Sequence, residues 1–254
     1  MPGPIRGRRL HGYDGRPTPL ALGCLLQLRD LGGFSIDGAR TELVDLRTRL
    51  RHVLWIGGGT GAGKSSVAIA LAERYGLERY NYDWHDSRDH AERTRADRHP
   101  HNATFLAMTL DERWLRHVPR EMADEAIDIF GERFEMVIED LLAMPEHTPV
   151  IADGFGLLPE LVHPILESPR QAIFLLPTPE LRVVALERRG WGSVEGTSDP
   201  VRARENRLAR DALLTDHIRG SAAALGLVAG EVDGSRSLAD IASAVARHFA
   251  PRMP

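Results

Sequence analysis

The chain has 254 residues, of which 43% are hydrophobic and 27% charged, and its formal net charge is −4 at pH 7. This composition is typical of a soluble globular protein, and the mildly acidic balance argues against non-specific binding to nucleic acid. The single cysteine, Cys24, excludes an internal disulfide, and the apolar stretch at residues 20–28 is too short to span a membrane. We therefore expect a cytoplasmic protein with no membrane or nucleic-acid partner.

The N-terminal part of the chain differs in composition from the rest. Gly, Pro and Arg dominate the first 19 positions, which predicts that residues 1–50 form a partly disordered extension. Leucines at helical spacing predict a helix over residues 39–51. Residues 51–254 are expected to form the folded domain.

Short apolar runs alternate with helical patterns from residue 52 onward, and this alternation predicts a parallel sheet covered by helices on both faces. Strands are predicted at residues 52–57, 77–83, 149–154, 171–177 and 227–234. Helices are predicted at residues 65–76, 103–144 with a break near Pro119, 157–166, 178–189, 200–226 and 237–249. The expected fold is a three-layer α/β domain, with residues 84–147 inserted at the edge of the sheet.

A glycine-rich loop follows the first predicted strand. Residues 58–65 match the pattern G-x-x-x-x-G-K-[ST] between a strand and a helix, the setting in which this pattern binds phosphate. Glycines let successive backbone N–H groups point at phosphate oxygens, while Lys64 reaches the β- and γ-phosphates and Ser65 offers a hydroxyl to Mg²⁺. The predicted phosphate-binding residues are Gly58, Gly59, Thr60, Gly61, Ala62, Gly63, Lys64, Ser65 and Ser66.

Lys64 is unusual in this chain, because it is the only lysine among the 32 basic residues. Arginine replaces lysine freely on most surfaces but not where a compact point charge is required. An alternative dinucleotide-binding pattern, Gly57-x-Gly59-x-x-Ala62 with Asp83 as the ribose-binding acid, leaves Lys64 without a role. The phosphate-loop interpretation is therefore preferred.

Two aspartates come at the ends of predicted strands, next to the expected phosphate site. Asp153 closes the strand at 149–154 and is a candidate Mg²⁺ ligand with Ser65, the alternative being a cap or turn residue. Asp83 closes the strand at 77–83 and could take the proton from an attacking hydroxyl, the alternative being an Asx turn. His85 and Asp86 could serve as that base instead, so its identity stays open.

Four histidines lie among charged residues at positions 85–101. Their spacing matches no familiar metal site, so we expect a solvated polar loop there.

Arginines are concentrated in residues 182–210, which carry seven of them. The segment runs from one predicted helix through the glycines at 190–197 into another, as a hinged lid over residues 186–212 would. Arg188 and Arg189 are expected to stabilise the transferring phosphoryl group and Arg204 to bind the nucleotide, because guanidinium groups neutralise phosphate charge. The alternative is a solvated helix with i,i+4 ion pairs, and which arginines contact phosphate is left open.

Residues 52–249 resemble the small P-loop kinases of the nucleoside-monophosphate kinase superfamily, which include shikimate- and gluconate-kinase-like and chloramphenicol-phosphotransferase-like proteins. GGGTGAGKSS is similar to their phosphate loop, IADGF to the Asp-Gly-Phe segment of adenylate kinases, and LERRG with the arginine-rich helix after it to their lid. The resemblance implies ATP with Mg²⁺ as donor and the strand order 2-3-1-4-5. It also implies an acceptor-side role for Asp83, and Asp233 and Gly234 near the adenine ring.

One departure from the family bears on the acceptor. Gly156 and Leu157 stand where adenylate kinases have Pro-Arg, which favours a non-nucleotide acceptor. The leading hypothesis is an ATP-dependent phosphotransferase acting on a hydroxyl of a small molecule. The alternative is an ATP-binding regulatory protein with little phosphotransfer activity. The sequence leaves the acceptor and the oligomeric state open.

Overall fold

The computed structural model describes residues 36–146 and 148–252. The proposed disorder in the N-terminal extension falls mainly on residues 1–35, which lie outside the described residues, and it stays a prediction. Within the described ranges, no helix combines the length and the apolar character that crossing a lipid bilayer requires.

Five parallel strands form one sheet in the order β2-β3-β1-β4-β5, which confirms the implied order 2-3-1-4-5. The three central strands are buried along their whole length, whereas β2 and β5 lie at the edges and are partly exposed. Burial on both faces explains the uninterrupted apolar runs in the central strands. The strands are β1 (Val53–Gly58), β2 (Glu78–Asn81), β3 (Val150–Asp153), β4 (Ala172–Pro177) and β5 (Val228–Val232).

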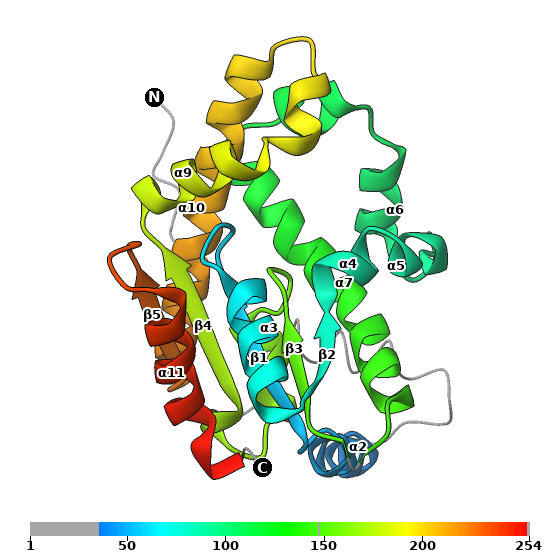
Figure 1. Ribbon diagram of the computed structural model, residues 1–254. Helices are drawn as coiled ribbons and strands as arrows, with labels where there is room; N and C mark the ends of the chain where they lie inside the picture. The colour runs from blue at the N-terminus through cyan, green and yellow to red at the C-terminus, as the bar shows by residue number, and fades with distance from the viewer. Residues whose placement is uncertain (1–35, 147, 253–254) are drawn as a thin grey trace, which may run out of the picture.

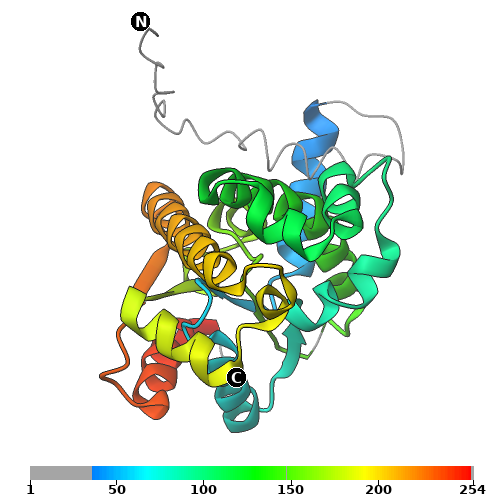
Figure 2. The ribbon, with the colours of Figure 1, turned by 90° about the horizontal axis from the view of Figure 1, so that it is seen from above.

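Helices cover both faces of this sheet (Figure 1), with α3 and α11 on one side and α7 and α10 on the other. Viewed from above, α7 and α10 run side by side (Figure 2). The α-helices are α2 (Ile36–Arg49), α3 (Lys64–Tyr75), α4 (Tyr82–Asp86), α5 (Asp89–Arg93), α6 (Pro100–Ala107), α7 (Pro119–Ala143), α8 (Pro159–Val162), α9 (Pro179–Arg189), α10 (Pro200–Ala224) and α11 (Leu238–Phe249). Shorter turns are η2 (Glu112–Arg116), η3 (His163–Ile165), η4 (Pro169–Gln171), η5 (Gly192–Gly196) and η6 (Ala250–Arg252).

Alternate residues of the central strands feed two hydrophobic cores. Ile56 of β1 packs with the α3 and α11 side chains, including Leu71 and Val245. Trp55, its neighbour in the chain, faces the opposite core and contacts Phe134 of α7, with ring centroids 6.2 Å apart. The period-two alternation of strand side chains thus builds the three layers. The predicted three-layer α/β fold, with helices on both faces of a parallel sheet, is thus confirmed.

Helix α2 packs against the domain rather than standing apart from it. Leu46 and Leu50 are buried in the core on the α7 side of the sheet. The Arg47 guanidinium donates to the carbonyl oxygen of Pro164 at 2.7 Å. The helix predicted at 39–51 is thus observed as α2, from Ile36 to Arg49, and its C-terminal end packs against the core.

The second strand is shorter than predicted, and Asp83 does not close it. β2 ends at Asn81, whose side chain accepts a hydrogen bond from the backbone N–H of Trp84 at 2.9 Å and so caps α4. Asparagine at this position favours a helix start over strand continuation. Asp83 lies in the first turn of α4.

The predicted polar loop at residues 85–101 is wrong. This segment contains α5 and the start of α6, and His90 and His99 are buried. The Nε2 atoms of His90 and His99 contact the carboxylates of Asp140 and Glu135 at 2.8 and 2.7 Å, so the polar character of these residues does not indicate exposure. The predicted long helix at 103–144 is divided into α6, η2 and α7.

Candidate functional site

The glycine loop connects β1 to α3 at the carboxyl edge of the sheet. Gly58 has φ 126°, and a Cβ there would lie 2.0 Å from the carbonyl oxygen of Leu175. Only glycine fits such a close approach. The loop therefore passes β4 and delivers the N-terminus of α3, which begins at Lys64, to the site where backbone N–H groups attract anions.

Lys64 is 6% exposed, and its Nζ donates to the carbonyl oxygen of Gly59 at 2.9 Å. Burial lowers the pKa of Lys64, while the nearby negative charges of Asp83 and Asp153 act in the opposite direction. The structure thus brings together three residues that the sequence pattern placed in separate segments.

Asp153 is fully buried at the end of β3 and accepts hydrogen bonds from both sides. Ser65 donates its hydroxyl to Oδ2 at 2.6 Å, and Asn81 donates to the same oxygen at 2.9 Å. The Nε of Arg79 donates to Oδ1 at 2.9 Å. The carboxylate is therefore held in one orientation next to the first residues of α3.

Asp83 interacts electrostatically with both Lys64 and Asp153, and it accepts a hydrogen bond from the backbone N–H of Phe155 at 3.0 Å. Burial raises the pKa of Asp83, and the positive charge of Lys64 opposes that rise. The two rival candidates have other partners: His85 bonds to Asp89 at 2.9 Å, and Asp86 forms an ion pair with Arg133 of α7.

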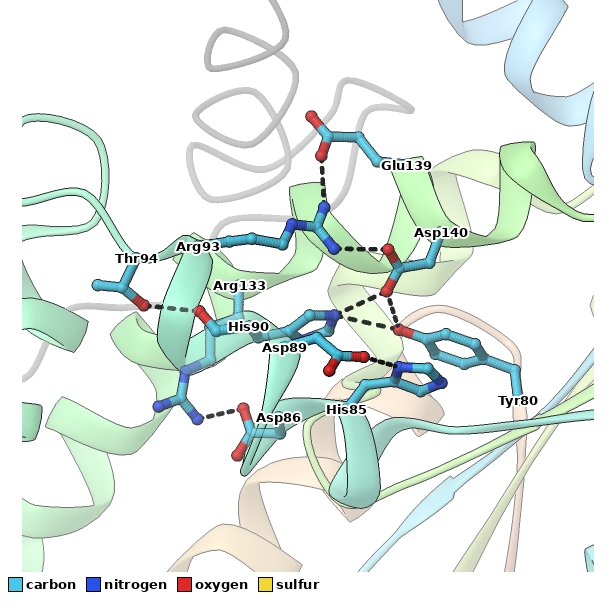
Figure 3. A network of polar contacts seen from close by, with 10 residues as sticks. All are labelled: Tyr80, His85, Asp86, Asp89, His90, Arg93, Thr94, Arg133, Glu139 and Asp140. Atoms are coloured by element: carbon cyan, nitrogen blue, oxygen red, sulfur yellow. Dashed lines mark hydrogen bonds and ion pairs between the residues drawn. The ribbon is translucent and has the colours of Figure 1, made fainter.

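A network of polar side chains fixes the inserted segment 84–147 to the edge of the sheet (Figure 3). Asp140 of α7 accepts hydrogen bonds from Tyr80 of β2 at 2.9 Å and from Arg93 at 2.6 Å, and it contacts His90 at 2.8 Å. The network therefore holds α5 and α7 beside β2, close to Asp83.

Replacing Asp140 by asparagine is expected to destabilise the fold by about 2 kcal/mol at pH 7, the free energy that corresponds to the lowered pKa of its carboxyl group. Burial alone would raise the pKa of Asp140, but hydrogen bonds from His90, Arg93 and Tyr80 outweigh it and hold the pKa at about 2. A depressed carboxylate pKa contributes stability above its unfolded value of 3.8, and that stability is lost as the pH falls toward 2. Urea denaturation between pH 7 and pH 2 measures the free energy of unfolding of both proteins. The difference between wild type and Asp140→Asn should shrink as the pH falls. A difference independent of pH would contradict the prediction.

The predicted phosphate-binding arginines differ in their surroundings. Arg188 and Arg189 are exposed in the last turn of α9, and the positive charge of Arg189 contributes to the lowered pKa of Lys64. Arg204 of α10 forms an ion pair with Glu195 at 2.6 Å and is partly exposed. The structure thus places Arg189 near the loop lysine and pairs Arg204 with an acid of η5.

Asp233 and Gly234 follow β5 at the carboxyl edge of the sheet. The carboxylate of Asp233 accepts hydrogen bonds from the backbone N–H and the hydroxyl of Ser235 at 2.9 and 2.7 Å, which closes a tight turn. Asp233, Val232 and Arg236 line a hollow of about 260 Å³ between β5 and α11.

Sequence inspection missed Arg79 and Asn81 as partners of Asp153. Both belong to β2, where Asn81 pairs in register with Asp153. Residues two apart in a strand point to the same face, so the sequence indicates that Arg79 and Asn81 share one face of β2. It does not indicate that this face meets Asp153, because that depends on the pairing of β2 with β3.

No protein-family model matches the chain, and no curated protein matches it. Solved structures that resemble it include an uncharacterized protein from Eubacterium ventriosum ATCC 27560, with 16% identity and a TM-score of 0.40 over 79% of this chain and 99% of that one. Another is a deoxyadenosine kinase from M. mycoides, solved with dCMP and a flexible dCDP bound, with 9% identity and a TM-score of 0.44 over 78% of this chain and 99% of that one.

Proposed function

We propose that the protein is an ATP-dependent phosphotransferase that acts on a hydroxyl group of a small molecule. The observation that carries the proposal is the position of Lys64, a buried cation at the phosphate loop that interacts with both Asp83 and Asp153. The loop and Lys64 can bind the donor phosphates, Asp153 can bind a metal cation, and Asp83 can interact with the acceptor. Such a site works by positioning and by charge neutralisation.

The donor phosphates are proposed to bind the loop from Gly58 to Ser66. Its backbone N–H groups and the N-terminus of α3 hold phosphate oxygens, and Lys64 exchanges its bond to Gly59 for the β- and γ-phosphates. Arg188 and Arg189 stabilise charge on the transferring group. Asp233 and Gly234 contact the adenine ring, and Arg204 contacts the nucleotide after leaving Glu195.

Ser65 and Asp153 would hold Mg²⁺. Their oxygens lie 2.6 Å apart at the start of the helix that receives the phosphates, and hydroxyl and carboxylate oxygens are the ligand types that Mg²⁺ prefers. When bound, Mg²⁺ would neutralise part of the negative charge of the phosphates. Asn81 and Arg79 keep the Asp153 carboxylate oriented toward Ser65.

Asp83 is proposed to accept the proton of the acceptor hydroxyl. The Phe155 N–H orients its carboxylate, and the inserted segment 84–147 surrounds the acceptor. His85 and Asp86 already have partners in Asp89 and Arg133, which supports Asp83 over them.

Replacing Arg79 by glutamine is expected to make the protein more dependent on Mg²⁺ and ATP for stability. Arg79 is the cation that pairs directly with the buried Asp153 carboxylate, and removing one partner of a buried pair costs about 3 kcal/mol. Mg²⁺ with a non-hydrolysable ATP analogue should replace part of the missing charge, so the rise in melting temperature on adding both should exceed that of wild type. An equal rise in the two proteins would contradict this expectation.

ATP turnover measured with and without a panel of hydroxylated metabolites tests the proposed function. Acceptor-dependent ADP formation supports the phosphotransferase. Tight ATP binding without acceptor-dependent turnover would favour the ATP-binding regulatory protein instead. Thermal-shift screening of nucleosides, sugars and antibiotics in the presence of a non-hydrolysable ATP analogue selects the acceptors to assay.

A further inference from the structure

A buried tryptophan of the inserted segment joins that segment to the arginine-rich helix. Trp114 of η2 is 6% exposed and packs with Met122 of α7 and with Val194 and Ala203 of the arginine-rich region. Its indole Nε1 donates to the hydroxyl of Ser193 at 3.1 Å. The indole is therefore held by contacts with both the inserted segment and the arginine-rich region.

Two arginines of α10 lie against the ring of Trp114. The guanidinium carbon of Arg210 is 4.7 Å from the ring centroid and that of Arg207 is 5.8 Å from it. Both distances lie within the range of cation–π attraction, which is strongest for tryptophan. Asp211 pairs with Arg210 at 2.6 Å and lies 3.9 Å from Arg207. One ring and one carboxylate thus hold two like charges together.

The carboxylate that pairs with these two arginines lies beside the phosphate loop. The side chain of Asp211 lines a small cavity together with Gly58, Gly59 and Thr60. The pKa of Arg207 is lowered by burial and by the charges of Arg210 and Arg189, while Asp211 opposes the shift. Arg189 also acts electrostatically on Lys64, so its charge is felt by both the loop lysine and Arg207.

We propose that Trp114 is a positioning residue that holds Arg207 and Arg210 against the phosphate chain of the donor. The two guanidinium groups and one carboxylate leave a net positive charge next to the loop, as a polyphosphate requires. Trp114 comes from the segment that surrounds the acceptor, so the acceptor side also organises cations that serve the donor. This inference rests on the proposed function.

Binding of a fluorescent, non-hydrolysable ATP analogue and of inorganic tripolyphosphate, each with Mg²⁺, tests the inference. Trp114→Leu is expected to weaken both by about tenfold, and Trp114→Phe, which keeps an aromatic face, by about threefold at most. Met122→Ala is the matched control, because Met122 belongs to the same cluster without forming the cation–π contacts. It should lower the melting temperature and leave both affinities unchanged.

A second measurement separates positioning from packing. Arg210→Gln should weaken tripolyphosphate binding in the wild-type background and have little further effect in Trp114→Leu, because the two changes remove the same arrangement. If the affinity losses of Arg210→Gln and Trp114→Leu add up in the double variant, the inference is overturned. Equal losses of affinity in Trp114→Leu and Met122→Ala would overturn it as well. Neither result would affect the proposed function. A wild-type chain that binds neither ligand would overturn the proposed function and the inference with it.

Discussion

Phosphoryl transfer is expected to fall by about 10³-fold when Lys64 is replaced by arginine, while the fold is retained. Lys64 is 6% exposed, and its Nζ reaches the carbonyl oxygen of Gly59 at 2.9 Å. A guanidinium group is wider and planar and distributes its charge over three nitrogens. It cannot place a compact charge in the space that the loop encloses, although the charge of the side chain is unchanged.

The matched control is Arg74→Lys, an exposed position on the same helix. It exchanges the same two residue types and should leave turnover and melting temperature unchanged. Acceptor-dependent ADP formation measures turnover, and circular dichroism with thermal melting checks the fold. Turnover near the wild-type rate in Lys64→Arg would contradict the proposed role of Lys64.

Asp83→Asn is expected to reduce acceptor-dependent turnover by about 10²- to 10⁴-fold, the range typical of losing a general base. The amide has the shape of the carboxylate, and its oxygen can still accept the Phe155 N–H bond, so the geometry is kept and the proton acceptor is lost. Nucleotide affinity should stay close to that of wild type. His85→Gln is the comparison, and a larger loss of turnover there would transfer the base role to His85.

The pH profile gives an independent test of Asp83. Burial raises its pKa above that of an ordinary aspartate, with Lys64 opposing. A base acts only when deprotonated, so turnover should fall as the pH is lowered through this raised pKa. In Asp83→Asn this fall in turnover at low pH should disappear, and the residual activity should not depend on pH in that range. If the fall persists in the variant, another group is responsible for it.

Patterns local in sequence predicted the layered architecture well. The phosphate loop, the α3 start at Lys64 and the buried central strands follow from glycine positions and apolar runs, which depend on neighbouring residues. The strand order came from family resemblance and matches the observed order. Errors arose where polar residues are buried, as with His90, whose partner Asp140 lies 50 positions away. Periodicity carries no information about such distant partners.

The sequence by itself was enough to predict a phosphate site and to assign Lys64 to it, because glycine conformations and a compact charge are properties of adjacent residues. Only the tertiary structure decided which side chains from distant segments contact one another around the site. Parallel pairing of β2 with β3 brings Arg79 and Asn81 to Asp153, and the packing of η2 on α10 brings Trp114 to Arg207 and Arg210. Contacts between segments so far apart arise from sheet register and helix packing, which no local pattern encodes.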